Sequence, residues 1–370
     1  MGSSRADGTR KVSKTTSTGR TRPFWVRGVS IPSPYFLAPI NTGFASDGVP
    51  DQRLMAFHQV RSGHGIGISY VGNVAIGEHC RVSTATPQID RAPKVWRDLA
   101  ATITDNGSVA GIQLACQLDN EPASRKWRNP DQRSYIARQR RFLSSLPAER
   151  LSRIVSGFVS AAQHAVDAGF KVVQIHSAHG YLLSRLLNPT LNVRTDAFGE
   201  DRTLMLSQIV RRIREANARV IVDVRISIES GLEASETDRG ITRRVVASII
   251  ESGADIVSLS SGMYEVNRFQ IYPTLDMGHA CYGESAKTIA DEWPSTVVNV
   301  AGNISNLGDL EGACSNLTFS IGRALIADPE FVSKSVLGRM DEIRECRRTG
   351  HCHYFSRGKA HIECGVNDEL

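Results

Sequence analysis

Three side chains that can donate hydrogen bonds or protons lie within six positions of one another, at His176, His179 and Tyr181. Paired imidazoles can stabilise an oxygen that gains negative charge during a reaction, and a phenol can deliver a proton. Each residue taken alone is better explained as a packed core or surface side chain. The interpretation therefore depends on the surrounding sequence, which over residues 176–202 reads HSAHGYLLSRLLNPTLNVRTDAFGEDR.

This stretch resembles the signature of the old yellow enzyme family, H-x-x-H/N-G-Y-L followed by L-x-P-x-x-N-x-R-x-D-x-[YF]-G. The resemblance implies that His176 and His179 hydrogen-bond the electron-withdrawing oxygen of a substrate, and that Tyr181 protonates the alkene after hydride transfer from reduced FMN. The family's G-G-S-x-x-N-R continuation is shortened to Gly199-Glu200-Asp201-Arg202. We therefore expect this surface loop, and its contacts with a nicotinamide cofactor or a partner, to differ.

The resemblance covers most of residues 31–336 and implies a site for FMN, with NADH or NADPH as the reductant. An amide suits the pyrimidine edge of the flavin because it offers both a donor and an acceptor, and a cation stabilises the reduced ring. The ring-side residues are Ala38, Pro39, Asn41, Gly72, Gln113 and Arg225. Asn41 stands where the family often has Thr or Cys, so the redox tuning is expected to differ.

The implied phosphate site lies near the last two predicted strands. Glycines let backbone N–H groups approach a phosphate, and an arginine can pair with it through two hydrogen bonds. The residues assigned to it are Gly302, Asn303, Gly322 and Arg323.

Eight short apolar runs recur in the sequence, and most of them end at or close to these candidate residues. Runs of this length, rich in Val and Ile and without polar alternation, are typical of strands buried on both faces of a parallel sheet. The runs are Tyr35–Ile40, Ile66–Val71, Val109–Leu114, Lys171–His176, Val220–Ile226, Asp255–Ser260, Val297–Ala301 and Leu317–Ile321. The predicted helices are Asp51–Ser62, Lys94–Asp105, Ala148–Ala168, Leu204–Asn217, Thr242–Glu251, Glu284–Glu292, Leu307–Ala313 and one that starts near Asp328.

Strand followed by helix, repeated eight times, predicts an α/β fold, a single (β/α)8 TIM barrel whose active site lies at the carboxyl ends of the strands. The long connections 115–147 and 177–203 are extended βα loops. A Rossmann sheet would require a G-x-G-x-x-G motif after the first strand, and this sequence has none there. We predict a disordered tail over residues 1–25, the FMN-binding barrel over 26–340 and a closing segment over 341–370.

The net charge of +6 is concentrated in two stretches, with +5 in residues 1–22 and +6 in residues 125–150. The remainder carries −5, so there is no general basic face, and we expect no nucleic-acid partner. The first twenty residues lack the apolar region of a secretory signal. A transit peptide or a segment left by cloning is the alternative. The basic stretch after the third strand is either a solvated helical surface or a means of attracting an anionic substrate or cofactor.

Seven cysteines without a regular framework indicate a reducing compartment, and we expect a cytoplasmic protein without a membrane span. The closing segment resembles a degenerate form of the four-cysteine iron–sulfur motif found in larger, dienoyl-CoA reductase-type relatives. Thr349 replaces one expected cysteine and Cys352 is displaced by one position, so we expect no cluster and no metal. Zinc bound by residues from Cys346, His351, Cys352, His353, His361 and Cys364 is the alternative, although the spacing matches no standard finger.

These observations favour an FMN-dependent oxidoreductase that reduces an activated C=C bond, of the enone or enal type, with hydride from NAD(P)H. The partner is then a small α,β-unsaturated substrate, which can be anionic. The protein could also form a homo-oligomer. Two alternatives stay open. One is a flavin-dependent desaturation or aromatisation in a biosynthetic pathway, and the other is a non-catalytic FMN-binding scaffold.

Overall fold

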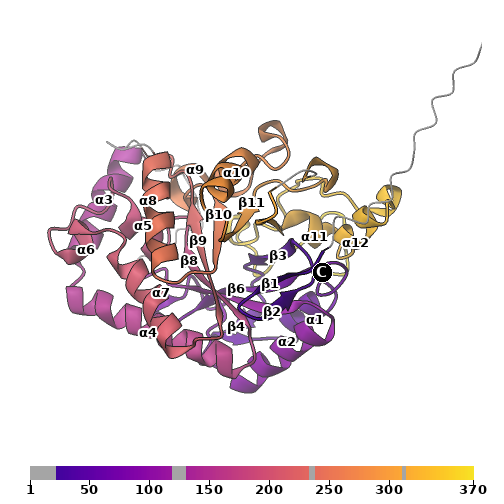
Figure 1. Cartoon of the computed structure of the whole chain (residues 1–370), viewed down its shortest axis with the longest axis horizontal. Coiled ribbons are helices and arrows are strands. Elements are labelled where there is room, and N and C mark those ends of the chain that lie inside the picture. Colours follow the sequence, from indigo (N-terminus) through magenta and orange to yellow (C-terminus); the bar gives the residue numbers. More distant parts are fainter. Residues whose placement is uncertain (1–21, 119–130, 233–237, 311–313) are drawn as a thin grey trace, which may run out of the picture.

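Eight parallel strands close into a barrel that is surrounded by helices (Figure 1). The computed structural model describes residues 22–118, 131–232, 238–310 and 314–370. The barrel strands are β3 (Tyr35–Ile40), β6 (Ile68–Ala75), β7 (Val109–Ala115), β8 (Val172–Ser177), β9 (Ile221–Ser227), β10 (Ile256–Ser260), β11 (Val297–Ala301) and β12 (Leu317–Ile321). They pair in this order, and β12 pairs with β3, which confirms the predicted TIM barrel.

The register between strands decides which polar side chains become neighbours inside the barrel. Gln113 of β7 is paired with Gln174 of β8, and Gln174 is paired with Asp223 of β9. Two positions further along the same strands, His176 is paired with Arg225. Because side chains alternate between the two faces of a strand, both pairs project to the same side of the sheet.

The barrel helices bury apolar faces against the outside of the strands. In α4 (Ala148–Asp167), the buried residues Leu151, Val155, Phe158, Ala162 and Ala165 recur every three or four positions, as an amphipathic helix requires. The others are α1 (Gln52–Gln59), α2 (Pro93–Asp105), α7 (Leu204–Ala216), α8 (Asp238–Glu251), α10 (Gly283–Glu292), α11 (Arg323–Ala327) and α12 (Phe331–Val336).

Some predicted elements differ from the structure in kind or in length. The predicted helix Leu307–Ala313 is a short 3-10 turn, η3 (Gly308–Leu310), and residues 311–313 lie outside the described part of the chain. Asn306 Oδ1 accepts a hydrogen bond from Gly308 N at 2.9 Å, a local turn that competes with a helix start. The second strand runs four residues beyond the predicted Val71, because Val74 and Ala75 pair with Leu114 and Ala115 of β7.

Additional elements close the two ends of the barrel. The hairpin of β1 (Phe24–Val26) and β2 (Val29–Ile31) packs Val26 and Ile31 against an apolar cluster that includes Phe36, Ile68 and Val172. The extended βα loops carry β4 (Ala45–Ser46), β5 (Val49–Pro50), α3 (Gln132–Ser145), α5 (Leu182–Leu187), α6 (Ala197–Glu200) and α9 (Tyr264–Ile271). Short 3-10 turns are η1 (Glu78–Cys80), η2 (Leu275–Met277), η4 (Met340–Glu342) and η5 (Phe355–Arg357). No helix among the described residues is long and apolar enough to cross a membrane.

The closing segment, residues 341–370, packs back onto the first and last βα units (Figure 1). Ile362 N donates a hydrogen bond to Thr42 O at 2.9 Å, just after β3. Asn367 Nδ2 donates to Ile326 O of α11 at 2.9 Å, and both side chains are buried. This segment therefore forms part of the wall around the carboxyl ends of the strands.

Candidate active site

The carboxyl end of β8 brings together the three residues predicted to do chemistry. The ring centroid of His176 lies 4.5 Å from that of Tyr181 and 5.0 Å from that of His179. The chain turns sharply here, with positive φ at His179 (62°) and at Gly180 (83°). Glycine suits the second position because it adopts this conformation without steric cost. The turn brings the side chains on both sides of it into one buried cluster.

Both histidines are neutral at neutral pH. Burial lowers the pKa of His176 well below its usual value, and the nearby Arg225 guanidinium acts in the same direction. Burial also lowers the pKa of His179, with smaller effects from His176 and Arg225. His179 Nε2 is 2.8 Å from Ser260 Oγ, whereas His176 Nδ1 has no hydrogen-bond partner among the described residues. A neutral imidazole can therefore offer a hydrogen bond at this buried site without carrying a charge into it.

Tyr181 is held in place by a residue of β6. Asn73 Nδ2 donates a hydrogen bond to the Tyr181 hydroxyl oxygen at 2.9 Å. Burial raises the pKa of Tyr181 well above 10, reinforced by the neighbouring Tyr264 and Tyr354, so the phenol keeps its proton. Because Asn73 occupies an acceptor position of the hydroxyl, the Tyr181 proton is directed elsewhere.

The predicted ring-side residues lie at the ends of neighbouring strands. Gly72 has no room for a side chain, since a Cβ there would lie 2.8 Å from Gln113 Cβ and 3.0 Å from Pro39 Cβ. Close packing at this glycine brings β3, β6 and β7 together. Asn41 Oδ1 accepts hydrogen bonds from Tyr354 Oη at 2.8 Å and Gly43 N at 3.3 Å.

Buried polar atoms without partners test whether these residues fit FMN. Among the described residues, neither Arg225 Nε nor His176 Nδ1 has a hydrogen-bond partner, although both side chains are buried. Buried polar groups are normally paired, so unpaired ones at the mouth of a barrel indicate a polar ligand. The set of hydrogen-bonding groups, with an arginine, an imidazole and the amides of Asn41 and Gln113, fits the polar edge of a flavin ring.

The predicted phosphate-side residues lie at the ends of β11 and β12. A Cβ at Gly322 would lie 3.9 Å from Ala38 Cβ, which places this glycine beside β3, whereas one at Gly302 would meet the Tyr282 ring at 2.5 Å. Asn303 Nδ2 donates to Gly278 O, and Arg323 Nη2 donates to Pro273 O at 2.7 Å. The contacts of Asn303 and Arg323 thus lead toward the β10–α10 connection, and their role toward a phosphate stays a prediction.

Several residues at the site carry no signal in the sequence. Tyr264 lies 5.9 Å from His179 and 6.2 Å from Tyr181 between ring centroids, and its hydroxyl is 3.0 Å from that of Tyr272. The Tyr272 ring in turn lies 3.8 Å from the His353 ring of the closing segment. Their sequence neighbours match no motif considered above. Asn73 and Gln174 could have been suspected, because each lies in a buried strand beside a predicted site residue.

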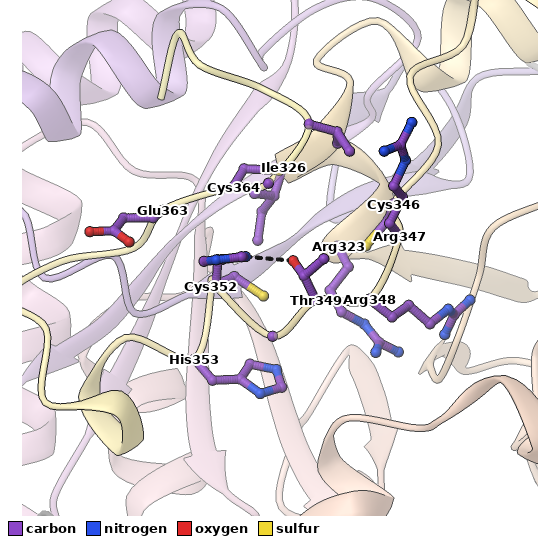
Figure 2. A pocket seen from close by; sticks show the side chains of 14 residues that line it. Arg323, Ile326, Cys346, Arg347, Arg348, Thr349, Cys352, His353, Glu363 and Cys364 are labelled. Carbon is purple, nitrogen blue, oxygen red and sulfur yellow. Dashed lines mark hydrogen bonds between the residues drawn. The ribbon is translucent and has the colours of Figure 1, made fainter.

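The closing segment encloses a small pocket beside the predicted phosphate end (Figure 2). Its lining includes Arg323, Arg348, Cys346, Cys352 and Cys364. Burial raises the pKa of Cys352 to about 11, and Cys346 contributes in the same direction, so this thiol is protonated at neutral pH. In the part of the chain that the structure describes, no three His, Cys, Asp or Glu side chains are placed to hold a metal ion.

Comparison with known proteins gives one family match. The sequence model of the NADH:flavin oxidoreductase / NADH oxidase family matches residues 36–342. An NADH oxidase from Thermoanaerobacter brockii is 27% identical over 327 residues, which cover 84% of this chain and 49% of that protein. An NADPH dehydrogenase from Bacillus subtilis is 27% identical over 308 residues, which cover 76% of this chain and 84% of that protein.

Solved structures show the same fold at low sequence identity. A 2-naphthoyl-CoA reductase complex superposes with a TM-score of 0.81 at 18% identity, over 95% of this chain and 57% of that one. Old Yellow Enzyme from Pichia sp. superposes with a TM-score of 0.67 at 18% identity, over 87% of this chain and 88% of that one. The chain spans about half the length of the first curated relatives that it matches.

Proposed function

Because the chain belongs to the NADH:flavin oxidoreductase / NADH oxidase family, we propose that it reduces a carbon–carbon double bond conjugated to an electron-withdrawing group. Members of this family use FMN, with NADH or NADPH as the reductant. When bound, FMN supplies a hydride to the β-carbon of such a substrate. The ring side would be held by Gln113 and Arg225, and the phosphate by Gly322 and Arg323.

The observation that carries this proposal is the convergence of two neutral imidazoles and one protonated phenol in one buried cluster. His176 and His179 bind the oxygen of the electron-withdrawing group and stabilise the negative charge that develops on it. Such preorganised donors typically contribute about 3–4 kcal/mol of barrier lowering. Tyr181 then delivers its proton to the α-carbon, and its raised pKa keeps that proton available at neutral pH.

Reduction of the double bond needs both imidazoles as hydrogen-bond donors to the substrate oxygen. Because their pKa values are lowered and both rings are neutral, only one nitrogen of each ring can donate. A neutral imidazole carries a single N–H, and the ring nitrogen opposite must accept or stay unpaired. Ser260 Oγ lies between His179 Nε2, at 2.8 Å, and Arg225 Nη2, at 3.3 Å. Since Arg225 can only donate to this hydroxyl, Ser260 can donate its own proton to His179 Nε2, which leaves the other nitrogen of His179 as the donor.

The test is anaerobic reduction of the FMN-loaded protein with NADPH or NADH, followed by mixing with a panel of acceptors. The panel contains enones, enals, nitroalkenes, maleimides and a quinone. Fast reoxidation by one of the alkene classes, with the saturated product identified by mass spectrometry, supports the proposal. Reoxidation by the quinone and oxygen alone contradicts it. Formation of a desaturated or aromatised product from a saturated ring would show that the reaction runs in the opposite direction.

We further propose that the preferred alkene carries a negative charge, because the basic stretch 125–150 follows β7 on the active-site side of the barrel. Arg125, Lys126 and Arg128 lie outside the described residues. In α3, Arg138 forms an ion pair with Glu265 of α9, next to Tyr264, so this helix borders the site. Replacing exposed Arg133 and Arg141 by Gln should raise KM for a carboxylated enone severalfold at low salt but not for a neutral one.

The matched control is Arg211→Gln, which removes an exposed cation from α7 on the outside of the barrel. A change in KM of equal size in this control, or none in the Arg133 and Arg141 variant at any ionic strength, would show that the basic stretch is only a solvated surface.

A further inference from the structure

The interior of the barrel beneath the site is polar, where such barrels usually hold bulky branched side chains. Six strands each contribute one fully buried polar residue to it. These residues are Tyr70, Gln174, Asp223, Ser258, Asn299 and Ser320. None of them has a part in the reaction proposed above, so their presence needs another explanation.

Asp223 is the centre of this group. Its Oδ2 accepts hydrogen bonds from Tyr70 Oη at 2.6 Å, Gln174 Nε2 at 2.6 Å and Ser258 Oγ at 2.9 Å. An ionised carboxylate can only accept, so it fixes the direction of every donor around it. Gln174 must turn its Nε2 toward Asp223, which leaves Gln174 Oε1 pointing to the other side.

The fixed Gln174 amide sets the orientation of Gln113. Gln174 Oε1 accepts a hydrogen bond from Gln113 Nε2 at 2.6 Å. Gln113 Oε1 therefore remains available as an acceptor, and it receives no hydrogen bond from the described residues. With the opposite orientation, Gln113 would present N–H donors in the same place.

We infer that Asp223 and Gln174 are positioning residues, which act through a chain of hydrogen bonds so that Gln113 presents an acceptor to the cofactor. This inference rests on the proposed function insofar as Gln113 borders the flavin. The proposed ligand of the Gln113 oxygen is an N–H group, which the pyrimidine edge of FMN supplies. The chain of contacts crosses three strands, β7, β8 and β9, at positions that are paired in the sheet register.

Asp223 also places a negative charge two residues before Arg225 on β9, and its Oδ1 has no partner in the described part of the chain. Burial raises the pKa of Asp223 to about 6, against the opposing effects of the three hydrogen bonds and of Arg225. The titratable groups that face it are Tyr70 from β6 and Arg225 on its own strand, with Gln174 and Ser258 as neutral neighbours. At neutral pH the carboxylate is ionised, and it is protonated below about pH 6.

The experiment measures FMN affinity by flavin fluorescence and the midpoint potential of the bound flavin as a function of pH. Gln174→Leu should weaken FMN binding roughly tenfold, the equivalent of one lost net hydrogen bond. Gln113→Leu should weaken it at least as much. The double variant should bind FMN no more weakly than Gln113→Leu alone, because both changes interrupt the same chain.

Asp223→Asn separates charge from orientation. Its side-chain oxygen can still accept from Gln174 Nε2 and from one of the two hydroxyls, and the other hydroxyl can turn away, so FMN affinity should stay within about threefold of wild type. The potential should become more positive at neutral pH, and its inflection near pH 6 should disappear. Ser69→Ala is the control, since Ser69 Oγ is equally buried in β6 but bonds His58 and Ser62 rather than this group.

Additive losses in the double variant, or an unchanged potential-against-pH curve in Asp223→Asn, would overturn the inference. Should Gln174→Leu fail to fold, Gln174→Met, which also lacks the amide, replaces it in the same comparison with Gln113→Leu. A wild-type protein that binds no FMN would instead overturn the proposed function. Wild-type binding combined with unaffected variants would refute only the positioning role.

Discussion

At the scale of single residues, the structure gives Tyr181 the environment of a proton donor. Its hydroxyl is buried, its pKa is raised well above 10, and its ring lies against His176. Tyr181→Phe should therefore lower the rate of enone reduction by about 100-fold or more, the usual contribution of a general acid. Quinone reduction, which protonates no carbon, should keep its rate. Stopped-flow oxidation of the reduced protein measures both reactions.

Tyr264→Phe is the matched control for this prediction. Tyr264 belongs to the same buried cluster, with its hydroxyl 3.0 Å from that of Tyr272. Loss of the Tyr264 hydroxyl should lower the rates of enone and quinone reduction by similar factors, and by less than Tyr181→Phe lowers enone reduction. Equal effects of the two substitutions on enone reduction would mean that the surroundings of the site as a whole, and not the Tyr181 hydroxyl, limit protonation.

The contact between Asn73 and Tyr181 predicts an unusual order of variants. Asn73→Ala removes a hydrogen bond to the phenol oxygen and should slow proton delivery by roughly tenfold, through loss of orientation. Asn73→Asp should be slower still, because an ionised carboxylate would accept the Tyr181 proton that is meant for the substrate. Lowering the pH until the introduced carboxylate is protonated should restore part of the activity. If the rates of Asn73→Ala and Asn73→Asp depended on pH in the same way, this account would be contradicted.

At the scale of elements, the closing segment reaches into the site through Tyr354. Tyr354 Oη donates a hydrogen bond to Asn41 Oδ1, across 313 positions of the sequence. This bond turns the Asn41 amide so that its Nδ2 is free to act as a donor. Tyr354→Phe should therefore change the absorption spectrum and the potential of bound FMN, at a cost of about 1 kcal/mol in the free energy of unfolding.

Ser356→Ala is the matched control for Tyr354→Phe, since Ser356 Oγ donates to His353 O of the same segment at 3.0 Å. It should leave the flavin spectrum unchanged. Identical spectra for wild type and Tyr354→Phe would mean that the closing segment covers the barrel without affecting the cofactor.

The elements themselves were largely predictable, and the outer partners of the site were not. Apolar runs reveal barrel strands because burial on both faces leaves little room for polar residues. The same logic failed at Asp223, which lies among Val222 and Val224 as a single polar residue in an apolar run. Its partners Tyr70 and Gln174 come from other strands, so only the register of the closed barrel reveals the contact. Tyr354 was missed for a similar reason, since nothing near it in the sequence relates it to Asn41.

At the scale of the whole molecule, buried neutral histidines predict an acid-sensitive fold. Burial, assisted by Arg61, lowers the pKa of His58 to about 3, while an unfolded histidine titrates near 6.5. Between these values the unfolded state binds more protons, so the free energy of unfolding falls as the pH falls below 6.5. His176 and His179 act in the same direction. Asp223 opposes them, because its raised pKa favours the folded state between about pH 6 and 3.8.

His58 tests this prediction away from the site, since its partner is Ser69 Oγ at 3.1 Å. Each buried neutral histidine should contribute about 1 kcal/mol to the loss of stability between pH 7.5 and 5.5. His58→Asn should reduce the pH dependence by this amount, even if the variant is less stable at every pH. Urea titrations at the two pH values measure it, and an unaltered difference between them would speak against the assigned protonation states.

The pairing of β12 with β3 also determines when the barrel can close during synthesis. Phe319 is paired with Tyr35, so one edge of β3 has no partner until nearly three hundred further residues have been made. At the usual rates of protein synthesis, this interval lasts roughly 15 to 60 s. During it the apolar strand Tyr35–Ile40 is exposed at an open edge and can pair wrongly with another chain. Assistance from chaperones during synthesis should therefore affect the yield of this protein more than its final stability, and the site that needs both Asn41 and Tyr354 is completed last.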